Sequence, residues 1–263
     1  MRHFTKAAAA IAVVAAGSAS SALAAENASG QIKQVRNMFS ASVDDSGSRT
    51  GTSIFYSALD FSGFGFTGSG GSVIYADDIL MNTPGGNDID EITFSVVSFN
   101  SDGSYTAGTG SGGVVTADVT VGLFADDGTG LPNFGASIAQ IGVTGIQIGS
   151  FSGGSVTIST KGLGIGKTNT TIWAALLYNN VTGPANADAT PLIDNVGQLI
   201  SNAATKGFSD DFFFNGASGG LSFFGGAPAN PYANFGWEFR GVPTPGAMAI
   251  FGIAGLAATR RRR

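Results

Sequence analysis

Polar and apolar residues alternate with a period of two along several short stretches of the chain. The clearest stretch spans residues 115–124, where Thr116, Asp118 and Thr120 alternate with apolar side chains. The apolar positions are Val115, Ala117, Val119, Val121 and Leu123. Successive side chains of a strand point to opposite faces, so this pattern predicts a half-buried β-strand.

A second stretch, residues 89–99, alternates in the same way at first, but its apolar residues then move from the even to the odd positions. Its apolar residues are Ile92, Phe94 and Val96, followed by Val97 and Phe99. A β-bulge adds one residue to a strand and would return both sets to the same face. We therefore predict a bulge between Val96 and Val97.

Residues 170–178 (TTIWAALLY) are apolar at both parities, which predicts a central strand covered on both faces. Further strands are expected at 32–43, 54–61, 73–80, 138–143, 156–160, 208–214 and 235–239, with turn signals such as PGG and DDGTG between strands. No long stretch repeats with the 3.6-residue period of a helix. The pattern predicts an all-β fold, a β-sandwich or jelly roll, as one domain over residues 25–241.

The chain begins with the features of a secretory signal peptide. A basic start precedes an apolar run over residues 7–16, and Ala22 and Ala24 fit the small-residue pattern of a cleavage site. These features predict a signal helix within residues 1–24, export through the Sec machinery and cleavage after Ala24.

The chain ends on a short apolar segment between prolines and arginines. With the preceding Val-Pro-Thr-Pro, residues 246–259 approach the ~20 residues of a membrane-spanning helix. Arginines at its end would stay on the cytoplasmic side. The segment therefore predicts a C-terminal anchor helix with the body outside. Either an enzyme later removes this helix, or it remains as an uncleaved tail anchor.

These last residues resemble the PEP-CTERM sorting signal of exported bacterial proteins. The matching positions are Val242, Pro243 and Pro245, the apolar residues 247–258, and Arg260, Arg261, Arg262 and Arg263. The family has Glu between the two prolines, where this chain has Thr244. The resemblance covers residues 242–263 alone. It implies transient retention in the inner membrane, cleavage by an exosortase-type membrane peptidase, and a final place at the cell surface or outside the cell.

The body resembles exported bacterial jelly-roll modules more loosely, over residues 76–178. The similar features are ADDI, the turn FADDGTGLPN and the Trp-bearing strand TIWAALLY. This resemblance implies a jelly-roll fold and brings no catalytic signature with it.

Composition excludes several chemistries. The chain has no Cys, and its one His, His3, lies in the predicted signal peptide. The body therefore lacks Ser-His-Asp and Cys-His nucleophiles, His or Cys zinc sites and c-type haem attachment. It holds all 18 acidic residues against Lys33, Arg36, Arg49, Lys161, Lys167, Lys206 and Arg240, a net charge of −11. Such a surface repels nucleic acids and anionic lipids.

The turn FADDGTGLPN offers a candidate metal site. Asp126, Asp127 and Thr129 carry oxygens of the kind that Ca²⁺ prefers, although Asp-Gly is in itself a strong turn signal. Another acidic pair, Asp77 and Asp78, lies in an expected strand, where neighbouring side chains point to opposite faces. We therefore do not expect these two to share a ligand.

Carboxylates and aromatic residues leave two further functions open. A glycosidase needs two carboxylates across a cleft, and no spacing selects a pair among Glu26, Glu91, Glu238 and the Asp residues. Trp173 and Trp237 would stack on sugar rings if they were exposed, whereas within a sandwich they would belong to the core.

Three classes of function follow. We favour an exported, non-enzymatic β-sandwich protein of the cell surface or extracellular matrix, sorted through its C-terminal anchor and without a cofactor. The second class is a surface module that binds carbohydrate or Ca²⁺, with an extracellular polysaccharide as partner. The third is a hydrolase that depends on Asp and Glu. No nucleic-acid partner is expected in any of them.

Overall fold

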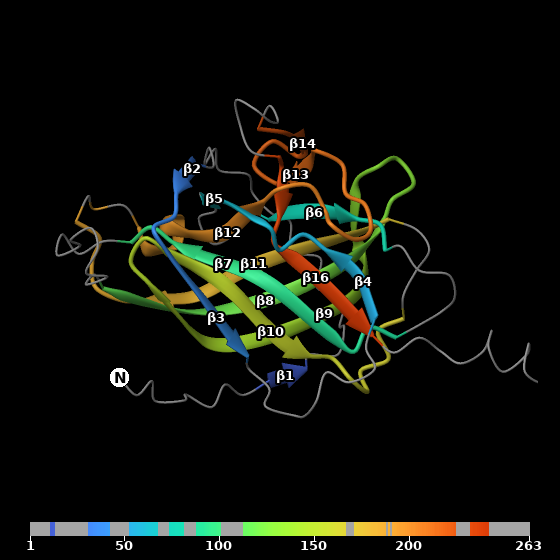
Figure 1. Cartoon of the computed structure of the whole chain (residues 1–263), viewed down its shortest axis with the longest axis horizontal. Helices are drawn as coiled ribbons and strands as arrows, with labels where there is room; N and C mark the ends of the chain where they lie inside the picture. Colours follow the sequence, from blue (N-terminus) through green and yellow to red (C-terminus); the bar gives the residue numbers. More distant parts are fainter. Residues whose placement is uncertain are drawn as a thin grey trace, which may run out of the picture.

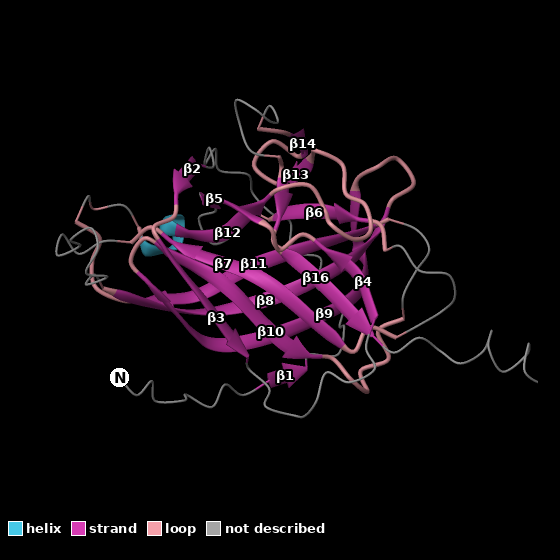
Figure 2. Ribbon diagram, viewed as in Figure 1, coloured by secondary structure: helices cyan, strands magenta, loops and turns pink. Residues whose placement is uncertain are grey.

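The computed structural model describes residues 11–13, 31–42, 53–67, 74–81, 88–100, 113–166, 171–187, 189, 191–224 and 232–241 (Figure 1). These residues form strands, turns and one short 3₁₀ helix, η1 (Leu192–Asn195), as Figure 2 shows. The strands are β1 (Ile11–Val13), β2 (Gln31–Gln34), β3 (Asn37–Ser42), β4 (Ser53–Ser57), β5 (Phe61–Thr67), β6 (Tyr75–Ile79), β7 (Glu91–Ser98), β8 (Val114–Asp126), β9 (Pro132–Gly149), β10 (Ser152–Ser159), β11 (Ile172–Thr182), β12 (Val196–Ser201), β13 (Phe213–Asn215), β14 (Gly220–Ser222), β15 (Asn234–Phe235) and β16 (Trp237–Gly241).

The strands form two sheets, and the all-β prediction is confirmed. The first sheet has seven strands in the order β1-β9-β8-β11-β6-β13-β14. The second has nine strands: β2-β5-β12-β7-β10-β3 in a row, with β15 on β12 and β16 between β7 and β4. All pairs among the described strands are antiparallel except β3 with β10.

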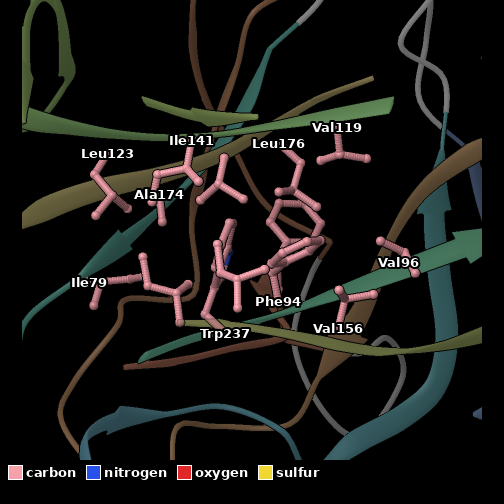
Figure 3. Close-up of a cluster of buried hydrophobic side chains, with 14 of the residues drawn as sticks. Ile79, Phe94, Val96, Val119, Leu123, Ile141, Val156, Ala174, Leu176 and Trp237 are labelled. Carbon is pink, nitrogen blue, oxygen red and sulfur yellow. The ribbon is translucent and has the colours of Figure 1, made fainter. Parts of the chain in front are cut away.

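The two sheets pack face to face as a β-sandwich, with one large hydrophobic core between them. The seven-stranded sheet contributes Leu123, Ile141 and Ala174, and the nine-stranded sheet contributes Phe94 and Trp237 (Figure 3). Trp237 and Phe94 are completely buried, so burial of large apolar side chains is the main force that holds the layers together.

Strand β8 confirms the clearest sequence prediction. Its inward residues Val115, Val119 and Leu123 are buried in the core, and the intervening Thr116 and Thr120 are partly exposed on the other face. The period-two alternation therefore correctly predicted both the presence of this strand and which of its faces is buried.

The predicted bulge in β7 is wrong. The ladder from β7 to β10 runs without interruption from Glu91 to Ser98, with Val96 opposite Gly154 and Val97 opposite Gly153. Val97 points away from the main core into a small second cluster with Phe99 and Leu199. The parity changes because both faces of β7 are covered, and not because the strand contains an extra residue.

Strand β11 confirms the expected central strand, since it lies between β8 and β6. Sequence patterns missed β12, which contacts both β5 and β7 in the middle of the second sheet. Its sequence VGQLIS contains a Gly and two polar residues, so its apolar pattern is weak although the whole strand is buried.

The predicted terminal helices lie almost entirely outside the described residues. Within the predicted signal helix only β1 is described, and these three residues form an extended strand on β9 rather than a helix. β1 pairs with β9 because β9 is otherwise an edge strand with free backbone groups. In the described part of the chain, no helix has the length and apolar character needed to cross a bilayer.

Candidate functional site

The outer face of the seven-stranded sheet carries an unusual number of apolar side chains. Directly opposite each other on β8 and β11 are Gly122 with Ala175 and Phe124 with Trp173. The exposed face of an antiparallel sheet is normally polar, because one side packs on the core and the other faces water. This face therefore departs from the usual alternation.

A shallow groove of about 100 Å³ lies on this face. Its lining residues are Ile74, Thr120, Gly122, Phe124, Gln140, Ala175 and Leu177. Gly122 and Ala175 are opposite each other and have the smallest side chains of the lining, and the Phe124 ring lies over Gly122, 2.7 Å from the position of a Cβ atom there. Gln140, which pairs with Gly122 from β9, and Thr120 place an amide and a hydroxyl at the same groove.

One lining residue of the groove, Phe124, belongs to an aromatic cluster on the same face. The Phe134 ring centroid lies 5.0 Å from that of Phe124 and 5.2 Å from that of Phe214, both in edge-to-face contact. Trp173 belongs to the same cluster and donates its indole Nε1–H to Asp126 Oδ2 at 3.0 Å. Trp173 and Trp237 are both buried, in agreement with the expectation that they belong to packed clusters.

Beyond this cluster, apolar side chains are exposed around β13 and β14. Leu221, which pairs with Phe214, is 47% exposed, and the flanking Phe212 and Phe223 are 42% and 61% exposed. The last two rings contact each other edge to face at 5.5 Å. The apolar character of the outer face thus continues to the end of the sheet.

The turn that was a candidate calcium site uses its oxygens internally. Asp126 Oδ1 accepts the Gly128 N–H at 2.7 Å, and Asp127 Oδ1 accepts both the N–H and the hydroxyl of Thr129 at 2.7 Å. The two hydrogen bonds from Thr129, that of its hydroxyl first, lower the pKa of Asp127. The geometry is that of side chains that stabilise a β8–β9 hairpin, while Ca²⁺ binding by Asp126, Asp127 and Thr129 remains a prediction.

Two carboxylates considered for catalysis share one cation. Glu238 Oε1 accepts from Arg240 Nε at 2.5 Å, and Glu91 Oε1 lies 3.6 Å from the same nitrogen. Glu238 also accepts the Ser57 hydroxyl at 2.8 Å. Glu91 and Glu238 are on the paired strands β7 and β16, so the arrangement ties these strands together.

A polar cluster that the sequence did not predict surrounds Ser209. The Ser209 Oγ lies 3.3 Å from Asp77 Oδ1, 3.1 Å from Asp78 Oδ1 and 2.9 Å from Asn234 Oδ1. Asp77 and Asp78 therefore contact the same hydroxyl, while the expectation that they do not share a ligand stays a prediction. Asp77 points toward the core and Asp78 toward the outer face, yet Ser209 lies beside the edge of β6, where it reaches both.

The segment between β12 and β13, residues 202–212, brings Ser209 to this position. Phe208 exchanges two backbone hydrogen bonds with Leu80, at 2.8 and 2.9 Å, so the segment continues along the edge of β6. Gly207 precedes this bridge with φ of +77°, a conformation that favours glycine. The Asp210 N–H then donates to Asp78 at 3.1 Å.

Burial dominates the electrostatics of this cluster. It raises the pKa of Asp77 well above the usual range, with a further increase from the charge of Asp78. It also raises the pKa of Asp78 to about 6, against which hydrogen bonds from Asp210 and Ser209 act. Among the described residues, no Lys or Arg forms an ion pair with either carboxylate.

The remaining predicted site residues, Ala22, Ala24, Val242, Pro243, Thr244, Pro245 and Arg260 to Arg263, lie outside the described residues. Comparison with known proteins adds no assignment. No protein-family model matches the chain, and no curated protein or solved structure is significantly similar to it.

Proposed function

We propose that this chain is an exported protein of the cell surface or extracellular matrix that acts by binding and not by catalysis. The signal-like N-terminus and the PEP-CTERM-like C-terminus support export through the Sec machinery and processing by an exosortase-type peptidase. On this proposal the β-sandwich body, of jelly-roll type, is held briefly at the inner membrane and then displayed outside.

The groove on the outer sheet face is the observation that carries the binding function. It combines apolar side chains, the aromatic ring of Phe124 and two groups that form hydrogen bonds, Thr120 and Gln140. Sugar rings have apolar faces and hydroxyl edges, and this combination suits both. At about 100 Å³ the groove is smaller than the ~300 Å³ of the smallest typical ligand pockets, so it fits part of a long chain lying across the sheet.

The charge of the body narrows the class of ligand. A net charge of −11 before any bound ion repels polysaccharides rich in uronate, sulfate or phosphate. We therefore propose a neutral extracellular polysaccharide as the partner.

Two glutamines of β9 provide a matched test of the groove. Gln140 lines it, whereas Gln147 pairs with Thr116 farther along β8, and both are exposed. Affinity electrophoresis of the full-length chain through gels of neutral polysaccharides measures this binding. Gln140→Ala should weaken the affinity about fivefold, which corresponds to the ~1 kcal/mol of one hydrogen bond. Gln147→Ala should migrate like the unchanged chain. An equal loss of affinity in both variants, or no retardation of the unchanged chain by any neutral polysaccharide, would contradict the proposal.

The export route has a separate test. Replacing the four C-terminal arginines with serine should reduce membrane retention and release an uncleaved body, because the positive charges hold the helix end inside. Intact mass spectrometry of the native protein should show the loss of residues at both ends. Native protein that keeps both termini would refute processing.

A further inference from the structure

Strand β9 is a long strand at the edge of the first sheet that carries no charged residue. Its 18 residues, Pro132–Gly149, contain no Lys, Arg, Asp or Glu, although the body as a whole has a net charge of −11. Edge strands of soluble proteins usually carry charged side chains or bulges, because their free backbone N–H and C=O groups otherwise pair with other chains. The ladder with β8 shifts register on both sides of residues 139–143, but within them it is regular. This regular, uncharged stretch has the properties of an edge that pairs with another strand.

Residues of the predicted signal peptide cover part of this edge. β1 pairs antiparallel with β9, with Ala12 opposite Gly142 and Val13 opposite Ile141. β1 precedes Ala24, after which the signal peptide is expected to be cleaved. On the proposed function, export therefore removes the covering strand and leaves the backbone of β9 free at residues 141–143.

A second copy of β9 can replace β1 in the same register. The sequence of β1, Ile-Ala-Val, has the same order of apolar residues as Ile-Gly-Val at residues 141–143 of β9 itself. A second β9 placed like β1 has its Ile141 opposite Val143 and its Gly142 opposite Gly142. This pairing is the same from either copy, so it has twofold symmetry and closes as a dimer.

We propose that removal of the signal peptide allows two copies of this chain to pair through β9, joining their seven-stranded sheets into one continuous sheet. Hydrogen bonds between main chains hold such a pair, so it requires no exposed apolar patch. The acidic bodies repel each other, and the uncharged β9 is an edge where this repulsion is small. Before export, β1 covers the edge and keeps the precursor from pairing with other copies. The proposal rests on cleavage after Ala24 and does not depend on polysaccharide binding.

The dimer would place two grooves on one face. Opposite residues of an antiparallel pair lie on the same face of the sheet, so the outer faces of both copies point the same way. Gln140 lines the groove and lies two residues from Gly142 at the twofold axis, so the two grooves adjoin across the interface. Two linked sites bind one long chain more tightly than either site alone.

The test compares the full-length chain before and after removal of residues 1–24. A specific protease site inserted after Ala24 allows one preparation to be cut, and gel filtration in mild detergent separates the released peptide. Multi-angle light scattering then measures the protein mass of both forms. We expect a monomer before the cut and twice that mass after it. A dimer before the cut, a monomer after it, or larger open assemblies would overturn the proposal. Because the cut is made in vitro, the result is independent of whether cells process the chain.

Gly142→Lys and Gly142→Glu test the register at the centre of the dimer. In either variant two like charges lie directly opposite each other, so the dissociation constant of the cut chain should rise at least about tenfold. An equimolar mixture of the two variants brings opposite charges together and should restore dimers, a recovery that loss of folding cannot produce.

Gly220→Lys is the matched control. Gly220 also lies in an edge strand of the first sheet, β14, at a position with open space for a side chain. This variant should dimerise after the cut like the unchanged chain. Dimers that persist in both Gly142 variants, or that are lost in Gly220→Lys, would contradict pairing through β9. The mass of the unchanged chain before and after the cut tests the proposal without any variant.

Discussion

Adding one methyl group at Gly197 should disrupt the centre of the nine-stranded sheet. Gly197 in β12 pairs with Thr67 of β5 and Val97 of β7. A Cβ atom at this position would lie 1.9 Å from the Phe66 carbonyl oxygen and 2.9 Å from its carbonyl carbon. Both contacts are with backbone, so no side-chain rotation can relieve them and β5 must separate from β12.

The cost has two parts. Overpacking in a tightly packed interior typically costs 1–3 kcal/mol, and rigid backbone contacts place Gly197→Ala near the upper end, at about 3 kcal/mol. The Gly197 carbonyl also accepts the hydroxyl of the fully buried Tyr178. Strand movement that weakens this bond adds about 1 kcal/mol. A total of about 4 kcal/mol corresponds to a fall in melting temperature of about 8–16 °C for a domain of this size.

Differential scanning calorimetry of Gly197→Ala and Gly220→Ala measures this effect against a matched control. Gly220 is also a strand glycine, in β14, but nothing lies within 4 Å of a Cβ built there. Gly220→Ala should remain within about 0.5 kcal/mol of the unchanged chain. If Gly197→Ala melted within about 2 °C of Gly220→Ala, less than 1 kcal/mol by the same conversion, the close approach of β5 and β12 would be refuted.

Three further substitutions test other parts of the structure by urea denaturation. Val97→Ser should lower the free energy of unfolding by about 2–3 kcal/mol, because it removes methyl groups from a buried cluster and adds a hydroxyl. The control Val114→Ser, at an exposed position, should lower it by under about 0.5 kcal/mol. Equal effects would contradict the cluster on the outer face of β7. Asp126→Ala should lower the free energy of unfolding by about 1–3 kcal/mol, since the Trp173 indole and the Gly128 N–H both lose their acceptor. An unchanged urea midpoint would argue against those hydrogen bonds. Glu238→Ala should lower the free energy of unfolding by about 2 kcal/mol, because the bonds to Ser57 and Arg240 are lost while Glu91 keeps its contact with Arg240. An unchanged free energy of unfolding would show that this ion pair does not stabilise the fold.

The sequence by itself determined the fold class and much of the layer architecture. Alternation in β8 identified the strand and its buried face, and the two-sided apolar pattern of β11 identified a central strand. These predictions succeeded because a strand places successive side chains on opposite faces, which is a local property of the backbone. The absence of Cys and of a second His also excluded whole classes of site without any knowledge of the fold.

Only the tertiary structure decided what covers each face and which distant residues meet. Val97 is buried because Phe99 and Leu199 pack on the outside of β7, which a parity change alone cannot distinguish from a bulge. Gln140 and Thr120 become neighbours of one groove through the register of β8, β9 and β11. Ser209 reaches Asp78 across 131 residues of sequence because a backbone bridge between Leu80 and Phe208 directs the connecting segment along β6. The local period of two shows on which face of the sheet a side chain lies. The residues that contact it on that face depend on pairing between strands far apart in the chain, which a local pattern does not determine.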